Sequence, residues 1–157
     1  MDKIEILSKR FRTAIDIAKS ENEFYRYFDF KKFPDDCCDM TCDLLGYYLL
    51  ENGIETRQIN GACEYDDSRR HVWLETNDKK VIDITCDQFN DEFKLSQIID
   101  SVYIGEENEV HKIFSVDRCV ERNTNFTDSS LFEGFNKQPN FRQKKLIELY
   151  EIIEKYL

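Results

Sequence analysis

The chain has little that would place it in or across a membrane. No apolar run approaches the ~20 residues that a membrane-spanning helix needs. The N-terminal stretch mixes charged and apolar side chains and contains no apolar block of the kind that a signal peptide carries. We therefore expect a soluble, cytoplasmic protein with no membrane partner.

Positive charge is also scarce, because 22 basic residues stand against 32 acidic ones and the net charge is −10. An acidic surface repels phosphate backbones, which disfavours nucleic acid as a partner. A neutral or cationic peptide or protein is easier to accommodate, and we expect a substrate or partner of that class. The charge says nothing about the oligomeric state.

The sequence has no internal repeat, no low-complexity tract and no change of composition that would mark a second domain. Its hydrophobic fraction of 41% and aromatic fraction of 13% are typical of a globular protein. A chain of 157 residues is long enough to bury a core of its own. Residues 1–157 are therefore predicted to form a single domain.

Three of the six cysteines lie close together, at Cys37, Cys38 and Cys42. Without a secretory signal, reduced thiols are expected rather than disulfides, and a bridge between adjacent cysteines would be strained. With His71 these cysteines count to four zinc ligands, but there is no C-x-x-C pair and no second cluster. We expect no metal and no cofactor. The cysteines are then either small buried residues or include a reactive thiolate.

Helical periodicity appears in three places. Apolar residues recur at a period near 3.6 over residues 2–20, and a second helix is expected from Cys38 to Glu51. Asp35 and Asp36 offer N-cap chemistry and negative charge for its start, and the following Asn-Gly is a helix stop. A C-terminal helix is predicted over residues 141–157.

Between these helices the period changes towards two, which indicates strands. The expected fold class is α+β, with the second helix packed against an antiparallel sheet and a catalytic core spanning residues 33–118. We expect strands at 56–63, 70–76, 79–85, 101–105 and 111–116, a short helix at 91–100, and an irregular polar loop at 121–139.

Cys38 and His71 are candidates for a catalytic pair. A thiolate is favoured by the positive end of a helix and by a neighbouring imidazolium, and Cys38 is placed at the expected helix start. In "HVWLE" the alternation puts His71 and Trp73 on one face of a strand. A histidine at the mouth of this strand, beside the helix start, is in a position to supply the imidazolium.

Asp83 is the candidate for the third group, because an imidazole that acts as a base needs a partner that orients it. This aspartate is centred in the apolar strand "VIDIT", where an unpaired carboxylate would be costly. The hairpin of "HVWLE" with "VIDIT" would bring Asp83 near His71. The alternative is that Asp83 only ends a strand.

These residues resemble the transglutaminase-like superfamily, the cysteine-centred branch of the papain-like fold, and most closely its small bacterial-type members. The resemblance covers about a third of the chain and rests on an ordered series of short motifs. In order they are Cys38 opening a helix, "GIETR" from Gly53 to Arg57, Gly61, "HVW" with His71, and "DIT" with Asp83.

The resemblance implies a Cys–His–Asp triad with Cys38 as nucleophile, His71 as base and then acid, and Asp83 as its orienting group. The spacing to Gly53 selects Cys38 over Cys37, although Cys37 stays as the alternative. The expected activity is hydrolysis of an amide, in a peptide or a glutamine side chain, through a Cys38 thioester. The alternatives are acyl transfer to an amine, and a catalytically inactive binding module on the same fold.

The sequence departs from the family where the oxyanion would be held. Family members carry a tryptophan or a glutamine upstream of the cysteine, and "FDFKKFPDD" contains neither. The donors would then be the Cys38 N–H and a second group, for which Tyr25 and Tyr27 are candidates. Trp73 and Gln88 are the candidate substrate-binding residues, with the core and a turn as their ordinary alternatives. His111 is interpreted as an ordinary histidine at the end of a strand.

Overall fold

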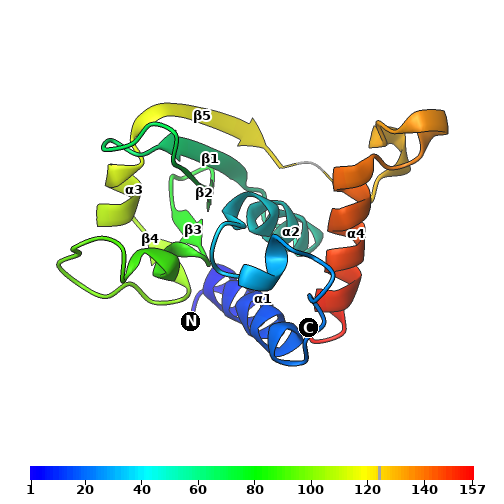
Figure 1. Cartoon of the computed structure of the whole chain (residues 1–157), viewed down its shortest axis with the longest axis horizontal. Helices are drawn as coiled ribbons and strands as arrows, with labels where there is room; N and C mark the ends of the chain where they lie inside the picture. The colour runs from blue at the N-terminus through cyan, green and yellow to red at the C-terminus, as the bar shows by residue number, and fades with distance from the viewer. Residues whose placement is uncertain (124) are drawn as a thin grey trace.

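Helices and an antiparallel sheet build an α+β architecture in the computed structural model, which describes residues 1–123 and 125–157 (Figure 1). The α-helices of these residues are α1 (Lys3–Ser20), α2 (Cys38–Glu51), α3 (Glu109–Ile113) and α4 (Phe141–Glu154). The strands are β1 (Arg57–Ala62), β2 (Arg70–Glu75), β3 (Val81–Asp83), β4 (Tyr103–Gly105) and β5 (Val116–Arg122). Short 3-10 turns lie at η1 (Phe30–Lys32), η2 (Cys86–Phe89), η3 (Ser129–Leu131) and η4 (Phe135–Lys137).

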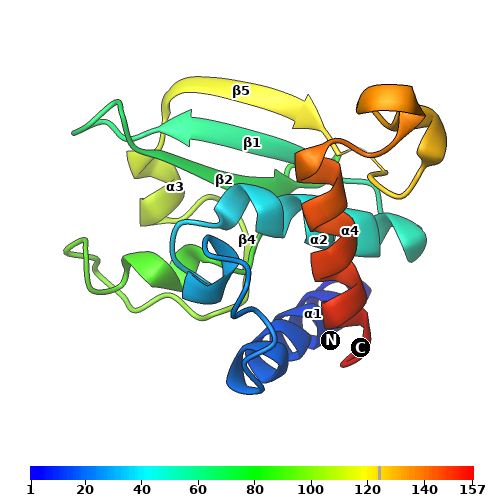
Figure 2. The same cartoon turned by 45° about the vertical axis from the view of Figure 1, so that its right-hand side comes forward.

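The sheet has the strand order β4-β3-β2-β1-β5, and each neighbouring pair is antiparallel. Figure 2 shows α1, α2 and α4 gathered together beside β1, β2 and β5. In the β1–β2 pair Gly61 lies opposite His71, and in the β2–β3 pair Leu74 lies opposite Ile82. The central strand β2 therefore carries His71 into the middle of the sheet.

The alternation of side chains in β2 divides the core into two clusters. Val72 and Leu74 join the larger cluster, which is made with apolar side chains of α1, α2 and α4. Trp73 belongs to the second cluster, which includes Phe89 and Phe114. Burial of such side chains is the main stabilising term of a fold of this size. His71 lies on the Trp73 side of β2, and its ring contacts that cluster.

Gly61 is required by a close approach of the chain. A Cβ atom built at this position would lie 1.9 Å from the carbonyl oxygen of Phe114, at the end of α3. No side chain fits there without moving the backbone. The glycine thus lets the segment between α3 and β5 pass directly over β1, which fixes where α3 lies.

The three long helices agree with the sequence prediction to within a few residues, and α2 begins at Cys38 and ends at Glu51 as expected. The expected aspartate cap of α2 is wrong. The N-cap is Cys37, which makes no side-chain capping bond, and Asp36 adopts a positive φ of 55°.

Two other predictions are wrong. Residues 91–100 form turns and bends instead of a helix, because the Asn90 side chain bonds both the N–H and the carbonyl of Ile99 at 2.9 Å and closes a loop. Residues 111–116 are not a strand, since α3 spans Glu109–Ile113 and β5 begins at Val116. The loop expected at 121–139 contains the end of β5 and the turns η3 and η4, and residue 124 lies outside the described residues.

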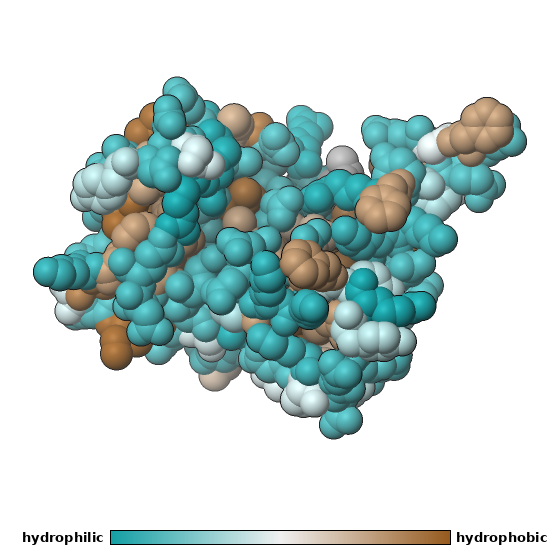
Figure 3. Space-filling view, in the orientation of Figure 1, coloured by the Kyte–Doolittle hydropathy of each residue, from teal (hydrophilic) through white to brown (hydrophobic). Residues whose placement is uncertain are grey.

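The face drawn in Figure 3 is mainly hydrophilic, with scattered apolar side chains that include some on the arm between β5 and α4. The exposed apolar residues of this arm and of the start of α4 are Leu131, Phe135 and Phe141. Among the described residues, none of the helices combines the length and the apolar character that crossing a membrane requires.

Candidate active site

Cys38 is the first residue of α2, where the backbone N–H groups have no acceptor within the helix. The residue is half-buried and packs against the edge of the larger core cluster. Cys37 differs, since it is 0% exposed and burial raises the pKa of its thiol to about 12. Of the two adjacent cysteines, only Cys38 combines access with the positive end of a helix.

Cys42, one turn further along α2, ties this helix to the central strand. Its thiol donates to the carbonyl oxygen of Val72 at 3.5 Å. Val72 directly follows His71 in β2, so this contact holds the first turns of α2 beside the histidine. Burial raises the pKa of the Cys42 thiol well above its ordinary value, which fits a packing role in the first turns of α2.

His71 is fully buried and uses one ring nitrogen to reach Asp83. Its Nε2 donates to Asp83 Oδ2 at 2.6 Å, whereas Nδ1 has no hydrogen-bond partner within the described part of the chain. Burial alone would lower the pKa of His71. The charge and hydrogen bond of Asp83, followed by the effect of the nearby Cys38 thiol, outweigh burial and raise the pKa of His71 to about 10. The contact with Asp83 therefore favours the imidazolium form of the ring.

Asp83 is 3% exposed and accepts bonds on both oxygens. Oδ1 accepts from the N–H of Thr85 at 2.9 Å and from its hydroxyl at 3.1 Å, which gives the "Asp-x-Thr" spacing a physical basis. Burial would raise the pKa of Asp83. The charge of His71 and the hydrogen bonds from both histidines outweigh burial and lower the pKa below its ordinary value of 3.8. The carboxylate is the paired anion that a buried imidazolium requires.

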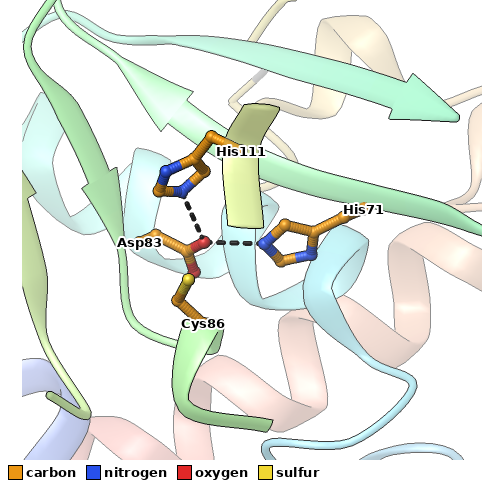
Figure 4. A group of neighbouring side chains, drawn as sticks. All are labelled: His71, Asp83, Cys86 and His111. Carbon is orange, nitrogen blue, oxygen red and sulfur yellow. Dashed lines mark hydrogen bonds and ion pairs between the residues drawn. The ribbon is translucent and has the colours of Figure 1, made fainter. Parts of the chain in front are cut away.

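The sequence interpretation missed His111. This residue lies in α3 and is fully buried, and its Nε2 is 3.1 Å from Asp83 Oδ2. The prediction of an ordinary histidine at the end of a strand is therefore wrong. Figure 4 shows the two histidines approaching the same carboxylate from different sides, with the sulfur of Cys86 beside it. An asparagine three residues before the histidine, followed by a glutamate, was the available signal for a helix start.

The candidate substrate-binding and oxyanion residues are placed as follows. Trp73 is fully buried between His71 and His111, so its indole faces the core and cannot touch a substrate in this conformation. Gln88 is half-buried in η2, and its amide donates to the Thr85 carbonyl at 2.9 Å. The hydroxyl of Tyr27 is already bonded to Glu148 at 3.0 Å. Trp73 thus supports the histidine pair from within the core.

A four-residue group carries the metal-ligating atom types. Ligand atoms of His71, Asp83, Cys86 and His111 all lie within 4.8 Å of one another. This set shares only His71 with the four residues that the sequence suggested. The backbone N–H of Asn108 donates to His111 Nδ1, which leaves the ring proton on Nε2, the atom that faces the carboxylate. A protonated nitrogen cannot ligate a metal, so the group fits a hydrogen-bonded network better than a metal centre.

Comparison of the chain with protein-family models, with curated proteins and with solved structures gives no match in any of the three.

Proposed function

We propose that the protein is a cysteine-dependent hydrolase of amides, with Cys38 as nucleophile and His71 and Asp83 as its base and orienting group. The proposal includes the papain-like arrangement that the motifs suggest, in which the nucleophile opens a helix and the histidine and aspartate lie on neighbouring strands. The substrate class is a peptide bond or a glutamine side chain, and acyl transfer to an amine is the alternative outcome of the same thioester.

One observation carries the proposal. His71 is held by Asp83 through Nε2, Nδ1 has no hydrogen-bond partner among the described residues, and Cys38 contributes to the raised pKa of the ring. Most buried polar side-chain atoms are hydrogen-bonded, and among the described residues only Ser8 Oγ and Trp73 Nε1 share this condition with His71 Nδ1. A buried Nδ1 without a partner, next to a half-buried thiol at a helix start, supports an imidazolium–thiolate pair.

The chemistry follows from these positions. The Cys38 sulfur attacks the amide carbon, and the proton on His71 Nδ1 passes to the leaving nitrogen, so that an amine or ammonia departs and a thioester remains. His71, now neutral, accepts a proton from water as the water attacks the thioester. The acid is released and the thiolate and imidazolium return. In this mechanism the Cys38 N–H, at the first position of α2, donates to the oxyanion of both steps.

The rate of alkylation of Cys38 by iodoacetamide, mapped by peptide mass spectrometry, tests the pair. In the wild type Cys38 should react much faster below pH 7 than Cys119, the exposed thiol. His71→Ala should remove this difference, whereas Cys37→Ser, the matched change at the adjacent cysteine, should keep it. Equal reactivity of Cys38 and Cys119 in the wild type would contradict the proposal.

The reaction type is identified by mass spectrometry of glutamine-containing peptides after incubation with the protein. Conversion of an amide to an acid indicates deamidation, chain cleavage indicates a peptidase, and loss of ammonia with two chains joined indicates acyl transfer. Cys38→Ser with wild-type unfolding behaviour is the control, and product formation by that variant would exclude Cys38 as the nucleophile.

A second candidate, a binding module without turnover, is favoured by one observation. His71 is completely enclosed, with the rings of Phe89 and Phe114 packed 4.9 and 5.4 Å from its own ring. An acid that protonates a leaving group must reach that group. Fast alkylation of Cys38 without any product from a broad peptide mixture would favour this second function.

A further inference from the structure

His111 shares the triad carboxylate with His71. Asp83 Oδ2 accepts from His71 Nε2 at 2.6 Å and lies 3.1 Å from His111 Nε2. The two imidazole rings are stacked with centroids 6.3 Å apart, and both are 0% exposed (Figure 4). His71 comes from the central strand β2, whereas His111 comes from α3, which is far along the chain.

The tautomer of His111 is fixed by the start of α3. The N–H of Asn108 donates to His111 Nδ1 at 3.1 Å, and the Asn108 side chain accepts from the N–H groups of Val110 and His111. This reciprocal arrangement is a capping box, in which the third helical residue bonds back to the N-cap. An accepting Nδ1 carries no proton, so the ring presents an N–H at Nε2 to Asp83.

The position of α3 is also fixed from outside. The Arg118 guanidinium donates to the His111 carbonyl at 2.7 Å and lies over the Trp73 ring at 5.0 Å. Gly61 permits the close passage of the segment that follows α3. His111 is thus a buried donor whose direction is set by its own backbone and by two neighbouring strands.

We propose that His111 is a positioning residue of the triad. Its Nε2–H holds the Asp83 carboxylate in the orientation that directs His71 Nδ1 towards Cys38. This inference rests on the proposed function and adds a fourth member to its site. Thr85 fixes one carboxylate oxygen and His111 the other, so that Asp83 is held on both sides while His71 exchanges its Nδ1 proton. The role is to hold an anion, not to transfer a proton.

A matched pair of substitutions separates this role from packing. In α4, Gln143 occupies the same third helical position. Its Oε1 accepts the Asn140 N–H at 2.9 Å while its Nε2 donates to the Leu131 carbonyl at 2.8 Å. His111→Gln can therefore keep both the cap and a donor towards Asp83. His111→Met has a similar volume and offers no donor.

The readouts are the alkylation rate of Cys38 across pH and the side-chain spectrum of ¹⁵N-labelled histidine. The chain has only two histidines, so each signal is assigned by one substitution. In the wild type His111 should show a protonated Nε2 and an unprotonated Nδ1. His111→Met should slow Cys38 alkylation by about tenfold or more. The lost hydrogen bond from His111 to the ionised Asp83 should lower the equilibrium constant for forming the imidazolium–thiolate pair by roughly that factor. His111→Gln should stay within about threefold of the wild type.

The pH dependence should move in a defined direction. With one donor fewer, the pKa of the buried Asp83 carboxylate rises, so the carboxylate is protonated at a higher pH and the imidazolium loses its counter-charge. The acid limb of the alkylation profile should therefore shift upward in His111→Met only. The titratable and charged groups that face His111 from the elements around it are His71, Asp83, Cys86, Tyr103 and Arg118.

The outcomes distinguish this inference from the proposed function. A folded His111→Met with the wild-type rate, acid limb and His71 signal overturns the inference, and so does a proton on His111 Nδ1 in the wild type. Zinc that binds and moves the His111 proton from Nε2 to Nδ1 would overturn it in favour of a metal centre. If wild-type Cys38 is no faster than Cys119, the proposed function fails. In that case the His71 Nε2–H signal in the ¹⁵N spectrum is the test of the role of His111. This signal must change in His111→Met and stay the same in His111→Gln.

Discussion

The substitution Asp83→Asn tests how much the buried pair contributes to stability and how that contribution depends on pH. The amide keeps the size of the carboxylate but loses its charge. It also turns one acceptor into a donor, which then faces either Thr85 or the two histidines. A surface change of the same kind, Asp78→Asn in the adjacent turn, serves as the control.

The magnitude follows from the pKa of His71. In the fold it is raised to about 10 from an ordinary value of 6.5. A raised pKa stabilises the fold fully below the unfolded value and loses this effect as pH rises towards 10. Between pH 6.5 and about 8.5 this raised pKa lowers the free energy of unfolding by roughly 2 kcal/mol. A Cys38 thiolate in the fold releases a proton on folding and offsets most of this fall, so the slope is measured in Cys38→Ser as well as in the wild type. The lowered pKa of Asp83 describes the same pair and adds nothing in this window, since its own effect is lost only in acid.

Urea unfolding at intervals from pH 6.5 to 8.5 measures this slope. The upper limit matters because burial also raises the pKa of Cys37, Cys42 and Cys86, and above about pH 8.5 unfolded thiols ionise and lower stability for an unrelated reason. Asp83→Asn should lose about 3–5 kcal/mol at pH 6.5, as expected for breaking a buried pair. Its profile should fall only by about 1 kcal/mol up to pH 8.5, where the three buried thiols are half-ionised in the unfolded chain. Asp78→Asn should keep the wild-type slope.

A Cys38→Ser profile without a decline over this window would refute the claim that Asp83 holds His71 charged in the fold. An equal decline in Asp83→Asn would show that the slope arises from another group. A wild-type decline as steep as that of Cys38→Ser would remove the main support for the imidazolium–thiolate pair.

Three further results are expected. Gly61→Ala should destabilise the fold by about 3 kcal/mol or more in urea unfolding, because its Cβ would meet the Phe114 carbonyl, whereas Gly53→Ala, with φ of +79° and open space around it, should cost about 1 kcal/mol. Arg12→Met should cost roughly 3 kcal/mol, since its guanidinium bonds the carbonyls of Ile84 and Ser101 at 2.7 and 3.0 Å and an aspartate of η2. Alkylation of Cys38 in Asp83→Asn should slow by at least tenfold at pH 6.5, and an unchanged rate would separate the thiol from the buried pair.

The sequence predicts the parts of the fold whose side chains alternate between core and solvent. α1 and α2 carry a buried face at helical spacing, and β2 and β3 carry one at a period of two. The hairpin between these strands was enough to bring Asp83 to His71. Both members of this pair lie on the central strands of the sheet, where register is fixed by burial on both faces.

The parts that were missed have no such pattern. All seven residues of β5 are exposed, because this edge strand is held by backbone bonds to β1 and not by a buried face. α3 has only five residues, too few for a helical period, and exists because Asn108 caps it. The role of His111 depends on this cap and on the contact that Gly61 permits. Both are tertiary features, and neither leaves a pattern in the local sequence.

The site and the fold share one carboxylate, which decides how substitutions in the site can be interpreted. Asp83 collects bonds from β2, from the residue before η2 and from α3, so its loss disturbs three segments at once. A variant of Asp83 or His71 that loses activity therefore does not by itself identify a catalytic residue. Cys38 is half-buried and does not bond Asp83, so Cys38→Ser should lower the free energy of unfolding by much less than Asp83→Asn does. Loss of turnover at Cys38 with stability preserved is the result that assigns chemistry to this helix start.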